Sequence, residues 1–96
     1  MIEHAVSFAL KHPPNSPEER DFLEDIRALK DLPGVQNFWV KRRMRSTGPF
    51  PFQISMWFEN QEALEVYGAS KVHVDFVNER WIPEVVEQQT LDFVEI

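Results

Sequence analysis

The chain has 96 residues, with 16 acidic and 10 basic side chains and a formal net charge of −6, which argues against nucleic acid or an anionic membrane as its main partner. It has no cysteine, which excludes disulfides and a thiolate nucleophile. The sequence has no metal-type His/Asp cluster, so we expect neither a metal nor a cofactor. It also has no apolar run of membrane-spanning length. The N-terminus has no basic segment before its interrupted apolar run. We therefore expect one domain over residues 1–96, located in the cytoplasm.

Alternation of apolar and polar side chains, with a period of two residues, predicts the strands. They span residues 2–11, 35–42, 50–58 and 85–94. A helical period predicts one helix after the first strand and a broken helix before the last. These helical segments span residues 16–30, 60–67 and 70–80. Ser16 and Glu19 form a capping box, with Pro17 at the favoured first position. The order β-α-β-β-α-β predicts a ferredoxin-like α+β fold, an antiparallel sheet with its helices on one face.

The second face of the predicted sheet also carries large apolar side chains. Trp39 and Trp57 occupy the alternation opposite to the most apolar one in their strands, and Ala5, Ser7 and Ala9 offer a flat surface of small residues beside them. In water this face would be an unusually large apolar patch. We therefore expect a homodimer in which two such sheets face each other and bury the tryptophans.

Tyr67 and His73 form the most distinctive candidate pair. They lie six positions apart, so on one unbroken helix they would stand roughly 120° apart around the axis. Gly68 is expected to end the first helical piece in the left-handed conformation, and Ser70 to cap the second. Such a corner lets the phenol and the imidazole converge on one pocket. The inward stripe of the second piece comprises His73, Phe76, Val77 and Arg80.

Several short motifs, in order along the chain, resemble the stress-responsive α/β-barrel (Dabb) domain family. They are MIEHAVSFALK at the N-terminus, PGV at residues 33–35, ALEVY at residues 63–67, His73-x-x-Phe76, and LDF at residues 91–93. The resemblance covers nearly the whole chain. It implies a ferredoxin-like protomer and a homodimer whose two sheets form a dimeric α+β barrel.

The resemblance also implies a site. The family includes plant stress proteins without established catalysis and a polyketide cyclase, olivetolic acid cyclase, which drives a cofactor-free aldol cyclisation. Tyr67 and His73 match its tyrosine and histidine, and His4 matches a histidine on its first strand. The pocket residues that carry over are Phe22, Leu23, Ile26, Ile54 and Phe76. This chain has Gln88 and Thr90 where the cyclase is apolar, which implies a smaller or more polar substrate.

The functional interpretation of the pair is acid–base chemistry next to a carbonyl group. His73 lies in the first turn of a helix, where the helix dipole disfavours the imidazolium and keeps a proton-accepting ring. Tyr67 would stabilise an oxyanion through its hydroxyl. The alternative is a core histidine with satisfied nitrogens beside a tyrosine that packs under the helix. His4 is expected in the pocket wall, and Arg80 either faces the ligand or pairs with an acid such as Glu84.

Two further features have open interpretations. The basic cluster comprises Lys41, Arg42, Arg43 and Arg45; it either receives an anionic group or protects a sheet edge from aggregation. Asp92 is expected to fix strand or turn geometry. Three functions follow for a homodimer with a small-molecule pocket between helices and sheet: a cofactor-independent cyclase- or lyase-type enzyme, a non-catalytic stress-responsive ligand-binding or protective protein, and a cofactor-free monooxygenase of the dimeric barrel group.

Overall fold

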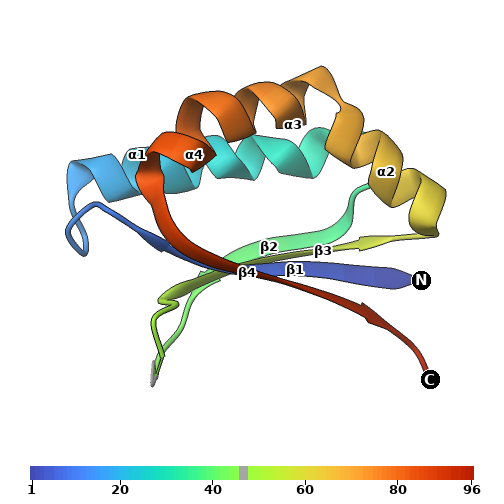
Figure 1. The fold of residues 1–96 in the computed structure, drawn as a ribbon, viewed down its shortest axis with the longest axis horizontal. Coiled ribbons are helices and arrows are strands. Elements are labelled where there is room, and N and C mark those ends of the chain that lie inside the picture. The colour runs from blue at the N-terminus through green and yellow to red at the C-terminus, as the bar shows by residue number, and fades with distance from the viewer. Residues whose placement is uncertain (46–47) are drawn as a thin grey trace.

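The computed structural model describes residues 1–45 and 48–96, so residues 46–47 of the predicted hairpin connection lie outside it. The strands are β1 (Ile2–Leu10), β2 (Gln36–Arg42), β3 (Phe52–Phe58) and β4 (Val85–Val94). The helical segments are α1 (Pro17–Ile26), the 3-10 segment η1 (Arg27–Asp31), α2 (Gln61–Ala69), α3 (Lys71–Phe76), the π-helical turn η2 (Val77–Trp81) and α4 (Ile82–Glu84). The strands form one antiparallel sheet in the order β2-β3-β1-β4, and the helices lie on one of its faces (Figure 1). The predicted ferredoxin-like α+β fold is confirmed.

The start of α1 follows the predicted capping box. The Ser16 hydroxyl accepts a hydrogen bond from the Glu19 backbone N–H at 3.2 Å, and the Glu19 carboxylate accepts one from the Asn15 N–H at 3.1 Å. Pro17 occupies the first turn, where no intrahelical N–H bond is lost. The helix ends at Ile26 and continues as η1, because the final turn of a helix often tightens to 3-10 geometry.

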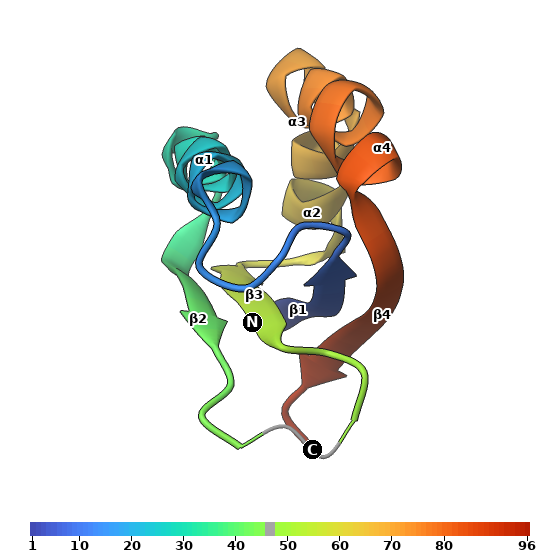
Figure 2. The same cartoon turned by 90° about the vertical axis from the view of Figure 1, so that its left-hand side faces the viewer.

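The core lies between α1 and the inner face of β1 and β3. Alternate residues of these two strands are buried on this face: Val6, Phe8, Phe52, Ile54, Met56 and Phe58. Phe22 of α1 is fully buried against them, with its ring centre 6.0 Å from that of Phe8. Each such burial contributes about 1.5–3 kcal/mol relative to exposure. Figure 2 shows α1 over the β2 side of the sheet and α3 and α4 over the β4 side.

The outer face of the sheet carries no helix in the part of the chain that the structure describes (Figures 1 and 2). Trp57 and Phe93 lie there with exposed fractions of 39% and 51%. Ala5 and Ser7 lie on the same face and are buried, so these small residues form the floor of this face. The side chains of Trp57 and Phe93 therefore remain open to solvent in the single chain.

Both predicted tryptophans lie on this outer face, and β2 has a bulge next to Trp39. Gln36 pairs with Trp57 and Trp39 pairs with Ser55, so β2 has one residue more than β3 between these pairs. Asn37 takes up the extra residue with a positive φ of 47°, which asparagine tolerates better than most side chains. Trp39 faces the same way as Trp57, because it pairs with Ser55, which lies two residues from Trp57 on β3.

Candidate functional site

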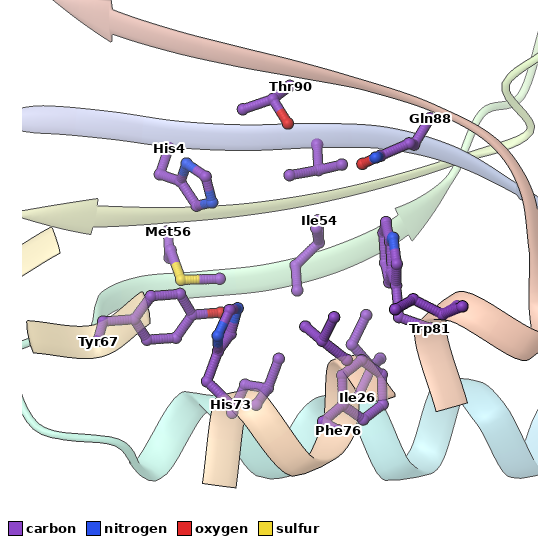
Figure 3. Close-up of a pocket in the computed structure, with 14 residues that line it drawn as sticks. His4, Ile26, Ile54, Met56, Tyr67, His73, Phe76, Trp81, Gln88 and Thr90 are labelled. Atoms are coloured by element: carbon purple, nitrogen blue, oxygen red, sulfur yellow. The ribbon is translucent and has the colours of Figure 1, made fainter. Parts of the chain in front are cut away.

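A cavity of about 450 Å³ lies between the helices and the inner face of the sheet (Figure 3). Its lining comprises His4, Val6, Ile26, Leu29, Ile54, Met56, Tyr67, His73, Phe76, Val77, Trp81, Ile82, Gln88 and Thr90. Ile82, Gln88 and Thr90 are exposed, so the cavity opens to solvent beside α4 and β4. Its volume falls in the range of about 300–1,000 Å³ that is typical of small-molecule sites.

The corner between α2 and α3 is formed by Ser70. Its extended backbone, with φ −64° and ψ 146°, ends α2 and starts α3. The Ser70 hydroxyl accepts a hydrogen bond from the His73 N–H at 3.4 Å and donates one to the Tyr67 carbonyl at 2.9 Å. The predicted left-handed end at Gly68 is wrong, because Gly68 lies inside α2 and has no positive φ. A capping serine is sufficient here, since an N-cap residue has extended backbone and a side-chain oxygen that accepts a helix N–H.

This corner brings Tyr67 and His73 into contact, as the sequence predicted. Their ring centres are 4.6 Å apart, and Figure 3 shows the Tyr67 hydroxyl directed toward the His73 ring within the cavity. His73 Nδ1 lies 2.9 Å from the carbonyl oxygen of Gly68. Because a carbonyl only accepts, Nδ1 must carry the proton. The neutral ring therefore keeps its lone pair on Nε2, which is the atom available as a base.

Burial shifts the pKa values of His73 and Tyr67 in directions that suit a base and a hydrogen-bond donor. Burial lowers the pKa of His73; the bond to the Gly68 carbonyl acts in the opposite direction, and nearby His4 lowers this pKa further. Burial also raises the pKa of the Tyr67 hydroxyl, because the whole Tyr67 residue is only 4% exposed. Near neutral pH the site therefore presents a neutral imidazole beside a protonated phenol.

A second histidine lies beside this pair. His4 Nδ1 is 2.5 Å from Asp92 Oδ1, and the ring centre of His4 is 6.3 Å from that of Tyr67. The carboxylate accepts, so Nδ1 carries the proton in this contact. Asp92 thus has a side-chain role beyond the strand geometry expected from the sequence. The missing signal was the register, since β1 and β4 pair His4 with Asp92.

Three predicted substrate-binding residues do not line the cavity, which corrects the sequence prediction. Phe22 is fully buried in the core, with its ring centre 5.5 Å from that of Phe76. Leu23 lines a smaller recess at the edge between α1 and β2. Arg80 donates to Glu84 at 2.6 Å and to Asp21 at 3.0 Å, which holds its guanidinium away from the cavity. The remaining predicted residues line the cavity: His4, Ile26, Ile54, Tyr67, His73 and Phe76.

The basic cluster does not line this cavity, and three of its four residues, Lys41, Arg42 and Arg43, make contacts within the chain. Arg42 donates to the buried carboxylate of Glu19 at 2.5 Å, and the Lys41 ammonium lies 4.5 Å from the Trp39 ring centre. Among residues 1–45 and 48–96, no group of three or more His, Cys, Asp or Glu side chains is placed to hold a metal ion. Over the same ranges, the helices are too short or too polar for any of them to span a bilayer.

Together, the fold and the site define a ferredoxin-like α+β protein with an imidazole–phenol pair in a small-molecule-sized cavity. The chain belongs to the Dabb family, the stress responsive A/B barrel domain, whose sequence profile matches residues 2–95. This confirms the resemblance seen in the sequence. A search of curated proteins found no significant match.

Solved structures show the same fold. A Dabb family protein from Mesorhizobium loti is 38% identical, with a TM-score of 0.96 over 99% of this chain and 96% of its own. A dimeric ferredoxin-like protein from Thermobifida fusca is 13% identical, with a TM-score of 0.80 over 98% and 90% of the two chains. The hydroxynitrile lyase from Passiflora edulis is 13% identical, with a TM-score of 0.86 over 99% and 93%.

Proposed function

We propose that this protein is a cofactor-independent enzyme of the lyase or cyclase type that acts on a small organic molecule next to a carbonyl group. The observation that carries the proposal is the contact between a neutral imidazole and a buried phenol inside one cavity. The opposite directions of their pKa shifts support a division of roles. His73 is the base and Tyr67 is the hydrogen-bond donor.

The proposed reaction begins with proton transfer. His73 Nε2 takes a proton from the carbon beside the carbonyl, the C–H electron pair forms the C=C bond of an enolate, and the carbonyl π electrons move to oxygen. The Tyr67 hydroxyl donates a hydrogen bond to this oxyanion. The enolate then attacks an internal carbonyl or expels a leaving group, and the imidazolium returns the proton. A positioned base typically contributes about 10²–10⁴-fold in rate, and one oxyanion donor about 10²–10³-fold.

The comparison with the Passiflora edulis enzyme supports the proposal only at the level of fold. That protein is a hydroxynitrile lyase, so a chain of this shape can host lyase chemistry. A fold does not determine a reaction, however, and the residues of the cavity must carry the argument. Here the support is the tautomer of His73, which the Gly68 carbonyl holds with Nε2 free.

The proposal is tested by proton exchange in D2O. We expect the protein to accelerate loss of the methyl NMR signal of para-hydroxyacetophenone, whose methyl protons lie beside the carbonyl. His73→Gln should lower the catalysed rate about 10²–10⁴-fold, and Tyr67→Phe about 10²–10³-fold. The matched control is His12→Gln, because His12 bonds Glu84 outside the cavity and its loss should leave exchange unchanged.

Each alternative function has its own result in this experiment. Folding of every variant is checked by circular dichroism. Equal exchange by His73→Gln and the unmodified protein would refute the enzyme proposal. Saturable thermal stabilisation by the ketone that survives in His73→Gln, without exchange, would indicate a ligand-binding protein without turnover. Oxygen consumption with the ketone would indicate the monooxygenase.

We also propose that two copies of this chain pair through their outer sheet faces. Trp57 and Phe93 are exposed on that face, next to a depression of about 370 Å³, and the Thermobifida fusca neighbour is a dimer. Burial of such a patch removes apolar area from water. Sedimentation should give twice the mass of the chain, and Trp57→Glu should give the single mass. The control is Val66→Glu, since Val66 is 56% exposed on α2. A single-chain mass for the unmodified protein would refute the dimer.

A further inference from the structure

We propose that the ligand is a neutral ketone or aldehyde with a second oxygen remote from its reacting carbonyl, and that Gln88 and Thr90 bind this second oxygen. The inference rests on the proposed function, since His73 and Tyr67 define where the reacting carbonyl lies. It adds a recognition site on the wall that β4 contributes to the cavity. Gln88 and Thr90 are specificity-determining residues and take no part in proton transfer.

The β4 wall is polar, whereas the floor and the α1 side of the cavity are apolar. Figure 3 shows the Gln88 amide and the Thr90 hydroxyl directed into the cavity, across from Ile54. Neither side chain makes a hydrogen bond to any of the residues that the structure describes, 1–45 and 48–96. A ligand that pairs with these groups keeps the hydrogen bonds that they otherwise make with water.

The register of the sheet gives the spacing between the two ends of the ligand. Asp92, Thr90 and Gln88 face the same side of β4 at successive alternate positions, and Asp92 holds His4 at the acid–base end. Two strand residues span about 7 Å, so Thr90 lies about 7 Å and Gln88 about 13 Å from Asp92 along the strand. A second oxygen on the far side of a single ring would therefore meet this wall when the carbonyl meets Tyr67.

The charge of the lining indicates that this ligand is neutral. No Lys, Arg, Asp or Glu lines the cavity among the described residues. A carboxylate or phosphate would lose its hydration without gaining a cationic partner, which is costly. An amide and a hydroxyl can each donate and accept, so they suit a hydroxyl or a carbonyl oxygen. The apolar lining between the two polar ends suits a ring.

The test compares two ketones of nearly the same shape, para-hydroxyacetophenone and para-methylacetophenone. NMR titration measures the Kd of each at a pH of about 6.5, the ordinary histidine value, where the phenol of the hydroxy ketone is still protonated. The unmodified protein should bind the hydroxy ketone about 3- to 10-fold more tightly, which corresponds to one or two net hydrogen bonds. Gln88→Met and Thr90→Val should each reduce this preference, and the double variant should remove it. These changes keep side-chain size and remove the polar groups.

The matched control is Gln89→Met, because Gln89 precedes Thr90 on the same strand but faces the outer side of the sheet, opposite Ser7. It should keep the full preference. An unchanged preference in the double variant, equal loss in Gln89→Met, or failure of the unmodified protein to bind the hydroxy ketone would each overturn the inference. The proton-exchange assay separates this outcome from the proposed function. A preference for the hydroxy ketone without proton exchange would support the recognition site and refute the enzyme proposal. Proton exchange without this preference would support the enzyme proposal and refute the recognition site.

Discussion

Replacement of Ser70 by alanine tests whether the corner between α2 and α3 holds the candidate pair together. The hydroxyl of Ser70 bonds to both sides of the corner, to the His73 N–H at 3.4 Å and to the Tyr67 carbonyl at 2.9 Å. Ser70→Ala removes both bonds and keeps the backbone and the β-carbon. The change should therefore loosen the orientation of the two rings without opening a large cavity.

The expected loss of stability follows from these two bonds. Loss of a helix N-cap costs typically about 1 kcal/mol. The second bond adds little, because the Tyr67 carbonyl still accepts the backbone N–H of Ser70 at 3.2 Å and is not left without a partner. We expect a total loss of about 1–1.5 kcal/mol. For a domain of this size, that corresponds to a decrease in Tm of roughly 4–12 °C.

Thermal unfolding at a fixed protein concentration measures this decrease, since a dimer makes Tm depend on concentration. The matched control is Ser16→Ala, which removes the equivalent cap of α1, a hydrogen bond of 3.2 Å from the Glu19 N–H. Both variants should unfold at lower temperature. Only Ser70→Ala should also slow proton exchange of para-hydroxyacetophenone, because Ser70 bonds the backbone of Tyr67 and His73 whereas Ser16 bonds that of Glu19.

Two results would refute this reasoning. An unchanged Tm in Ser70→Ala would mean that the hydroxyl does not stabilise the corner. Equal exchange by Ser70→Ala and Ser16→Ala, at temperatures well below both transitions, would mean that the corner does not orient the pair. Ser70→Asp adds a further check, because aspartate keeps the cap acceptor and should restore most of the stability.

Two predictions concern pH. The lowered pKa of His73 keeps the base neutral at neutral pH. The exchange rate should therefore stay constant down to a pH of about 6.5, the ordinary histidine value, and fall only below it. A rate that already falls above this pH would contradict the assignment of His73 as the base. Burial acts to raise the pKa of Glu19, but its bonds to Arg42 and Asn15 and the charges of Arg42 and His12 leave it lowered. Its stabilisation is therefore present above the unfolded pKa of about 4.3 and is lost as the pH falls through the lower folded value. Glu19→Gln should reduce the free energy of unfolding, measured in urea, more at neutral pH than near pH 3. The control is Glu18→Gln, at an exposed position, which should leave this free energy unchanged at both pH values. An equal loss in Glu19→Gln at the two pH values would contradict the role of the Glu19 charge.

The strongest sequence signals were local, and the structure follows them. The capping box at Ser16 and Glu19 starts α1, and the alternation in β3 buries Phe52, Ile54 and Met56 on one face. The convergence of Tyr67 and His73 was also predictable, since a break in the helix was needed to bring them together. Its location at Ser70 instead of Gly68 was less clear, because glycine permits a left-handed helix end without requiring one.

The contents of the cavity wall depended on tertiary structure. Periodicity identifies the inward face of α1, but not that Phe22 fills the core while Ile26 of the same face lines the cavity. Arg80 fits a helical stripe and its pair with Glu84 is local, four residues along the chain, but its ion pair with Asp21 forms only when α1 and η2 pack.

By itself, the sequence determined the order of the elements, their apolar faces, and the residue types at the corner, because these depend on neighbours along the chain. Only the tertiary structure decided that His4 meets Asp92, and that Gln88 and Thr90 share a cavity with His73. These contacts depend on strand register and helix placement, which come from packing between segments far apart in the chain.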